Sequence, residues 1–111
     1  MKVANDKIVD AGSMGADILS DAILIDQLYG FSLQSIYTGS PVGDLIFQVS
    51  NDDVTLPSQV VNWSNLATAV AIAASGSNLQ NFIGTNYKWL RVFFDRTSGS
   101  GSLTVTLCGK G

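Results

Sequence analysis

The sequence predicts a small all-β sandwich of the jelly-roll or immunoglobulin-like kind, and three observations support that prediction. Val, Ile, Thr and aromatic residues are plentiful, whereas the nine acidic residues are all Asp, so that good helix formers with charge are scarce. Short stretches alternate apolar and polar residues between clusters of Gly, Pro, Ser and Asn. The 111 residues suffice for one hydrophobic core and not for two ordinary domains. We therefore expect about seven or eight antiparallel strands in one domain.

The N-terminal residues carry a weaker signal than the rest of the chain. We expect residues 1–15 to form an N-terminal arm with a candidate first strand at 7–11, and residues 16–111 to form a single β-sandwich domain. A neighbouring subunit is one way to order such an arm, because chain ends have few contacts of their own. Residues 21–28 form a short apolar run that fits a buried strand or a helical turn, and its β-branched content favours the strand.

Two alternating segments in the first half of the chain predict a hairpin. Residues 30–38 and 44–50 each place apolar side chains on one face and polar side chains on the other. A cluster of Gly, Ser and Pro at 39–43 separates them by a short loop. Because such runs favour pairing with the nearest neighbour in sequence, we expect an antiparallel hairpin here.

The middle of the chain contains one ambiguous element. Residues 51–64 form a polar loop that contains Trp63 near its end. Residues 66–74 are rich in Ala, which suits a helix, yet β-branched residues alternate with Ala as in a strand. We favour the strand, because a turn at 73–78 then leads into another short apolar segment at 79–83.

The last two segments show the strongest alternation. Residues 88–95 and 102–108 each align three apolar side chains on one face, and a Ser and Gly run from 98 to 102 lies between them. We therefore predict a second β-hairpin. Such a run also has the composition of a phosphate-binding loop, but that chemistry requires a helix N-terminus directly after the loop. A strand pattern follows here, so we interpret the glycines as turn residues.

The composition excludes several classes of chemistry. The chain has no His, which removes the commonest general base, the commonest metal ligand and the nucleophile systems that depend on His. The single Cys108 permits neither an intrachain disulfide nor a cysteine metal cluster, and no neighbour in sequence would activate its thiol. We expect no enzymatic activity and no cofactor.

Charge and hydropathy narrow the choice of partners. A net charge of −3 with scattered cations provides no basic surface, so we expect no direct contact with nucleic acid. No apolar run reaches the roughly 18 residues that span a bilayer, and the N-terminus lacks the apolar stretch of a signal peptide. We expect assembly in the cytoplasm and no transmembrane segment. Charged residues make up only 14% of the chain, which is unusual for the surface of a free monomer.

The Asp residues are the remaining candidates for chemistry. A glycosidase-like pair of carboxylates is one option, but these residues stand at strand ends and turns, where Asp is favoured anyway. Asp52 and Asp53, with Asn51 and Asp44, would supply oxygen ligands to calcium, although no EF-hand-type loop accompanies them. We favour solvated turn acids and expect no metal site. An exposed pair could also dock a cation of a neighbouring subunit.

The aromatic side chains support two competing hypotheses. Five of them would form a sugar-stacking platform: Trp63, Trp89, Tyr29, Tyr37 and Tyr87. Alternation instead places Trp89 and Phe93 opposite the apolar face of their strand, where such residues more often form an interface. We favour the interface and name four candidate residues for it: Trp89, Phe93, Gly99 and Trp63. A bulky residue at Gly99 should then disturb assembly before it disturbs folding.

Several segments together resemble a known group of proteins. They are GFSLQSIYTGSPVGDLIFQVSND at 30–52, Asn62 with Trp63, and YKWLRVFFDRTSGSGSLTVTLCGKG at 87–111. Over roughly residues 20–111, this order of strands, turns and aromatic positions resembles small β-sandwich structural proteins of tailed and tailless bacterial viruses.

The resemblance implies a structural virion component of a bacteriophage, such as a capsid vertex (penton), spike-base, decoration or minor capsid subunit. Its partners would be copies of itself, as a homo-oligomer, and other virion structural proteins. Its location would be the virion, after assembly in the host cytoplasm. Low charge and many Ser and Thr residues independently suit a subunit buried among copies of itself. The alternative is a β-sandwich module that binds carbohydrate or a host surface.

Overall fold

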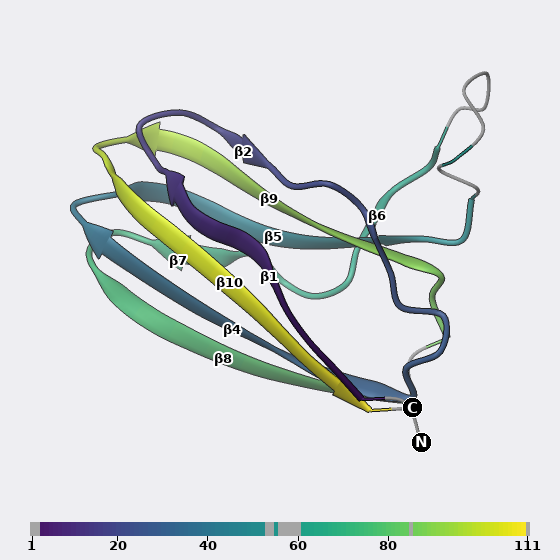
Figure 1. Cartoon of the computed structure of the whole chain (residues 1–111). Helices are drawn as coiled ribbons and strands as arrows, with labels where there is room; N and C mark the ends of the chain where they lie inside the picture. Colours follow the sequence, from purple (N-terminus) through teal and green to yellow (C-terminus); the bar gives the residue numbers. More distant parts are fainter. Residues whose placement is uncertain (1–2, 53–54, 56–60, 85, 111) are drawn as a thin grey trace.

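Alternating apolar and polar residues fold this chain into two antiparallel β-sheets that pack face to face (Figure 1). The computed structural model describes residues 3–52, 55, 61–84 and 86–110, and no helix occurs among them. The predicted all-β sandwich is confirmed. The strands are β1 Val3–Ser13, β2 Ile18–Leu19, β3 Ile23–Leu24, β4 Gly30–Gly39, β5 Val42–Ser50, β6 Ser64–Asn65, β7 Val70–Ile72, β8 Gly76–Ile83, β9 Trp89–Ser98 and β10 Gly101–Lys110.

The strand order is that of a jelly roll. One sheet has the order β1-β10-β4-β8, and the other has β9 and β5 at its centre. The short strands β2 and β3 both pair with β9, and the short strands β6 and β7 both pair with β5. β1 pairs with β10 in the four-stranded sheet, and β2 and β3 pair with β9 in the six-stranded sheet. β4 then pairs with β8 in the first sheet, and β5 pairs with β6 and β7 in the second. These pairs alternate between the two sheets along the chain, as in a jelly roll. This topology selects the jelly roll over the immunoglobulin-like alternative.

Both predicted hairpins are wrong. β4 pairs with β10 and β8 in the four-stranded sheet, whereas β5 pairs with β9 in the six-stranded sheet. β9 and β10 are likewise neighbours in sequence that belong to different sheets. Each short Gly-containing connection is therefore an arch from one sheet to the other. The apolar faces of both strands still point into the core, because they meet across the sandwich and not side by side.

The two arches lie against each other at one end of the sandwich. The backbone N–H of Ser40 donates to the carbonyl oxygen of Ser100 over 2.9 Å. Gly39 has a φ of 85° and Gly99 a φ of 75°, values that side chains other than glycine rarely adopt. A Cβ atom at Gly99 would also overlap the carbonyl oxygen of Ser40. The glycine run thus has a conformational role, as expected. The connection that it forms is an arch between the two sheets and not the turn of a hairpin.

The core lies between the inner faces of the two sheets. Alternate residues of β9 and β10 point inward, as the sequence predicts. Side-chain burial drives this packing at roughly 25 cal/mol per Å² of apolar surface. The largest fully buried side chains of the central strands are Phe31, Leu33, Leu45, Leu90, Val92, Phe94, Leu103, Val105 and Leu107.

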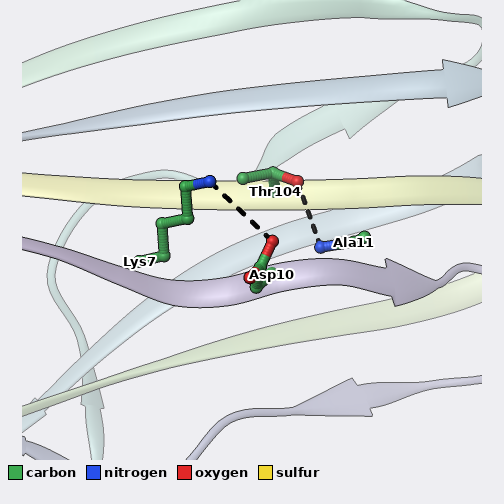
Figure 2. Close-up of polar contacts among 4 residues, drawn as sticks. All are labelled: Lys7, Asp10, Ala11 and Thr104. Atoms are coloured by element: carbon green, nitrogen blue, oxygen red, sulfur yellow. Dashed lines mark hydrogen bonds and ion pairs between the residues drawn. The ribbon is translucent and has the colours of Figure 1, made fainter.

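The N-terminal segment joins the four-stranded sheet as β1, which contains the candidate strand at 7–11 and pairs with β10 of the same chain. Its pairing is irregular, with two register shifts. At these shifts Lys7 Nζ lies 4.0 Å from Asp10 Oδ1, and the N–H of Ala11 donates to Thr104 Oγ1 over 3.1 Å (Figure 2). Ala11 has a positive φ of 52°. β1 is therefore a bulged edge strand.

The two ambiguous segments form strands that are shorter than expected. Within residues 66–74 only β7 is extended, and β8 begins at Gly76, earlier than the segment predicted from residue 79. Within residues 21–28 only β3 is extended, and a turn follows in which the N–H of Leu28 donates to the carbonyl oxygen of Ile25 over 3.0 Å. The preference for strand over helix in residues 66–74 is correct.

Candidate functional site on the outer face of the six-stranded sheet

The outward residues of β9 form the centre of the candidate site. Trp89, Arg91 and Phe93 alternate with Leu90 and Val92, which are fully buried, so that these three side chains lie on the outer face of the sheet. All three are half-buried. The neighbouring strands therefore supply side chains that cover part of each.

Arg91 links the strands of this face through a polar network. Its Nε donates to Gln48 Oε1 on β5 over 2.8 Å, and Gln48 Nε2 donates to Asn65 Oδ1 on β6 over 3.3 Å. The guanidinium carbon lies 4.2 Å from the centroid of the Trp63 ring, which is cation-π distance. Burial against these groups lowers the pKa of Arg91 from its usual value through desolvation. The charge therefore sits in a partly dry, aromatic environment.

A turn carboxylate positions Trp63 over Arg91. Asp52 Oδ2 accepts hydrogen bonds from the backbone N–H of Asn62 over 2.7 Å and from Asn62 Nδ2 over 3.1 Å. The Asp52 N–H in turn donates to Ser50 Oγ over 3.1 Å at the end of β5. This carboxylate ties the segment that carries Trp63 to the strand beneath it.

Apolar side chains flank the polar network on both sides. Leu19, Phe93 and Ile46 stand opposite one another in register across β2, β9 and β5. On the other side of Arg91, Leu24 stands opposite Trp89. Leu19 and Leu24 are each more than half exposed. The result is an apolar face around one partly desolvated cation, Arg91. Apolar side chains and Arg are both common at the centre of protein interfaces.

The indole of Trp89 adds an unusual feature to this face. Among the described residues, no hydrogen-bond partner lies near Trp89 Nε1, although the atom is buried. Buried indole N–H groups usually find a partner. Trp89 therefore has an unsatisfied donor that is buried beneath this face.

Three of the four residues proposed from the sequence lie on this face, namely Trp63, Trp89 and Phe93. Gly99 does not, because it occupies the arch between β9 and β10. Since any Cβ at Gly99 would overlap Ser40 and strain a positive φ, a substitution there would weaken folding first. This replaces the expectation that assembly would be disturbed before folding.

The structure does not assemble the five aromatic residues into one sugar-stacking platform. Tyr37 is buried in the core on the inner face of β4, and it packs beneath Gly76. Tyr29 precedes β4 in the four-stranded sheet, where its N–H donates to the carbonyl oxygen of Lys110. Trp63 and Trp89 share the outer face of the six-stranded sheet, whereas Tyr87 lies in the connection just before β9 and is 39% exposed. A smaller platform of these two remains.

Sequence reasoning missed the polar centre of the site. The alternation of β9 already placed Arg91 between Trp89 and Phe93, which was an available signal. The pairing of Arg91 with Gln48 was not available, because it depends on β5 and β9 being neighbours and not on the predicted hairpins.

Two of the candidate calcium ligands, Asp52 and Asn51, accept hydrogen bonds that hold loops in place. Asp52 binds Asn62, and Asn51 Oδ1 accepts a hydrogen bond from the N–H of Lys88 over 3.0 Å. Asp44 lies on another part of β5, and Asp53 lies outside the described residues. Within the described ranges, no group of three or more His, Cys, Asp or Glu side chains is placed to hold a metal ion.

The four-stranded sheet has a separate open depression on its outer face. It has a volume of about 290 Å³ and is lined by Gly30, Phe31, Ser32, Asn81, Ile83, Cys108, Gly109 and Lys110. Cys108 is exposed there.

In the described part of the chain, no helix has the length and apolarity needed to cross a membrane.

Comparison with known proteins identifies the fold and no family. No protein-family model and no curated protein matches the chain. A solved structure of the infectious bursal disease virus VP2 subviral particle is similar, with a TM-score of 0.55, 14% identity, and coverage of 97% of this chain and 32% of that chain. This chain thus spans about a third of the length of the viral chain.

Two bacterial structures are similar over more of their own length. A chain of Bacillus endospore appendages, which are disulfide-linked pili, has a TM-score of 0.50 and 10% identity, with coverage of 97% of this chain and 88% of that chain. A chitosan-binding module of a chitosanase/glucanase from Paenibacillus sp. IK-5 has a TM-score of 0.54 and 14% identity, with coverage of 93% and 74%. At these identities the likeness establishes a β-sandwich that structural and carbohydrate-binding proteins share.

Proposed function

We propose that this chain is a structural component of a bacteriophage virion and that it acts by assembly, with the outer face of the six-stranded sheet as a contact surface. The observation that carries the proposal is the apolar face around Arg91, where Trp89 and Phe93 are half-buried and Leu19 and Leu24 are largely exposed. Exposed apolar surface of this kind typically serves protein contact. The proposal assigns no reaction and no cofactor to the chain.

Two further observations support an assembly role. The fold is similar to that of a protein that forms a subviral particle and of a protein from disulfide-linked pili. The short segments at 30–52 and 87–111 resemble structural proteins of bacterial viruses. We propose a capsid vertex, spike-base, decoration or minor capsid position, in contact with copies of this chain and other virion proteins.

The physical mechanism would be burial of the outer face against a partner. Large aromatic side chains and Arg dominate binding energy when they lie at the centre of an interface and lose water. Arg91 is already partly desolvated by Trp63 and Gln48, so that less desolvation remains to oppose contact.

Mass spectrometry of purified virions tests the proposal. We expect the chain in the particles, and we expect Phe93→Ser to reduce its incorporation about tenfold because a central apolar contact is lost. Ile36→Ser is the matched control, since Ile36 is an exposed apolar residue of the other sheet; it should enter particles like wild type. Absence of the chain from purified virions would contradict the proposal.

A second candidate function is carbohydrate binding, and one observation favours it. Trp63 lies over Arg91 beside the amide of Gln48, which combines a stacking surface with hydrogen-bonding groups as sugar sites do. The fold is also similar to that of a chitosan-binding module. A glycan array with and without calcium, including chitosan oligosaccharides, tests it. Retention that Trp63→Ala abolishes and Tyr87→Ala preserves would support the second function, and no retention would exclude it.

A further inference from the structure

Strand β8 forms a long, regular edge of the four-stranded sheet. In the part of the chain that the structure describes, β8 pairs with β4 alone, so that its other side presents unpaired backbone groups (Figure 1). The register with β4 runs without interruption from Gly76 to Ile83. This segment, GSNLQNFI, contains no charged residue and no Pro. Leu79 and Ile83 on its outer face are 68% and 72% exposed.

The other edges of the sandwich are protected by ordinary means. β1, at the opposite edge of the same sheet, has two register shifts and carries Asp6. It also carries Lys7 and Asp10 (Figure 2). The edges of the six-stranded sheet consist of strands of two or three residues, β2, β3, β6 and β7. Bulges, charges and short edge strands all prevent association between sheets. Among the described strands, β8 is the one long edge that lacks these devices.

We infer that β8 pairs antiparallel with β8 of a second copy of this chain, so that two four-stranded sheets become one continuous sheet around a two-fold axis. A second copy is the occupant because β8 is the one edge in the described chain that is both long and regularly paired along its length, and an identical β8 matches it. The absence of charge in β8 removes like-charge repulsion in such a symmetric pair.

The side chains select a register centred on Leu79. Directly opposite residues in antiparallel strands share a face, so that Leu79 of one copy meets Leu79 of the other on the outer face. On the inner face, Gln80 of each copy then stands opposite Asn78 of the other. Gln80 Oε1 and Asn78 Oδ1 are both buried without a hydrogen-bond partner among the described residues. Rotation of the two amides in the pair lets each oxygen accept from the other amide's NH₂ group.

This inference rests on the proposed assembly role and deepens it by naming one contact. The contact nevertheless lies on the other sheet from Trp63, Trp89 and Phe93, so that the two surfaces can be tested apart. Pairing of one edge strand buries less area than a typical stable interface. We therefore expect a weak, concentration-dependent dimer that gains strength when other contacts act with it.

Disulfide trapping tests the register. With Cys108→Ser as the background, Leu79→Cys should form a crosslinked dimer under mild oxidation, because opposed Cα atoms in an antiparallel pair lie about 4.5–5.5 Å apart. Ile83→Cys is the matched control, since it is equally exposed but lies far from its own copy in this register. It should crosslink at least about tenfold more slowly. Equal crosslinking of both variants would overturn the inference, as would no crosslinking of Leu79→Cys.

Sedimentation equilibrium tests the pairing itself. Leu79→Lys places two ammonium groups opposite each other and should raise the dissociation constant of the dimer at least about tenfold. Ile36→Lys adds the same charge on the same face, from the central strand β4, and should leave the constant unchanged. Equal effects of the two changes would contradict pairing through β8. If the chain enters virions while Leu79→Lys associates like wild type, this inference fails and the proposed function stands.

Discussion

At the scale of single residues, the candidate site depends on what holds Trp63 against Arg91. The ring lies at 4.2 Å from the guanidinium, and Asp52 holds the segment beside it through Asn62. Among the described residues, Asp52 forms no ion pair with Arg91. It is a positioning residue, and its effect on the site passes through the backbone at Asn62.

Asp52→Ala should release Trp63 and lower stability. Loss of the acceptor for two hydrogen bonds from Asn62 should cost about 1 kcal/mol. In a Trp89→Phe background, fluorescence of Trp63 should shift to longer wavelength as the ring leaves Arg91. Asp21→Ala, which removes another exposed carboxylate, is the control and should change neither quantity. An unchanged spectrum in Asp52→Ala would contradict the positioning role.

Gly99→Ala should destabilise the fold. The methyl group meets the carbonyl oxygen of Ser40 at a positive φ of 75°, and strain of this kind costs about 1–3 kcal/mol. Urea denaturation followed by circular dichroism measures the loss. Ser100→Ala in the same arch should be nearly neutral, because the backbone carbonyl of Ser100, and not its side chain, accepts the hydrogen bond from Ser40. A Gly99→Ala variant as stable as wild type would show that the arches do not need this glycine.

At the scale of elements, the strands were predictable and their partners were not. Alternation on β4, β5, β9 and β10 correctly assigned the buried faces. A hairpin and an arch bury the same faces, so that alternation cannot distinguish pairing within a sheet from packing between sheets. The contact of Arg91 with Gln48 depends on that distinction. The site could therefore be placed on β9 from sequence, but its polar network could not.

The pairing of β5 with β9 also opposes two like charges. Asp44 and Asp95 stand directly opposite each other and both are exposed, which is destabilising in an antiparallel pair. Asp95→Asn should raise the free energy of unfolding by about 0.5 kcal/mol. The gain should shrink at high salt because exposed charges are screened. Asp26→Asn elsewhere on the surface is the control, and an equal gain there would attribute the effect to net charge alone.

At the scale of the whole molecule, two surfaces on opposite sheets are available for contact. The outer face of the six-stranded sheet is apolar around Arg91, and β8 is an open edge of the four-stranded sheet. Contacts on both sides let one small domain join several neighbours, and weak contacts that act together reach high overall affinity. This arrangement suits a subunit of a larger assembly.

The most direct test of the assembly role is the molar mass of the Leu79→Lys variant, measured by light scattering after size exclusion over a range of concentrations. This change weakens pairing through β8, so that remaining association which Phe93→Ser abolishes reports the outer face of the six-stranded sheet. We predict a mass that rises above the 11.7 kDa of one chain, and a return to that mass when Phe93→Ser is added. A mass of one chain at every concentration, without Phe93→Ser, would contradict assembly through this face.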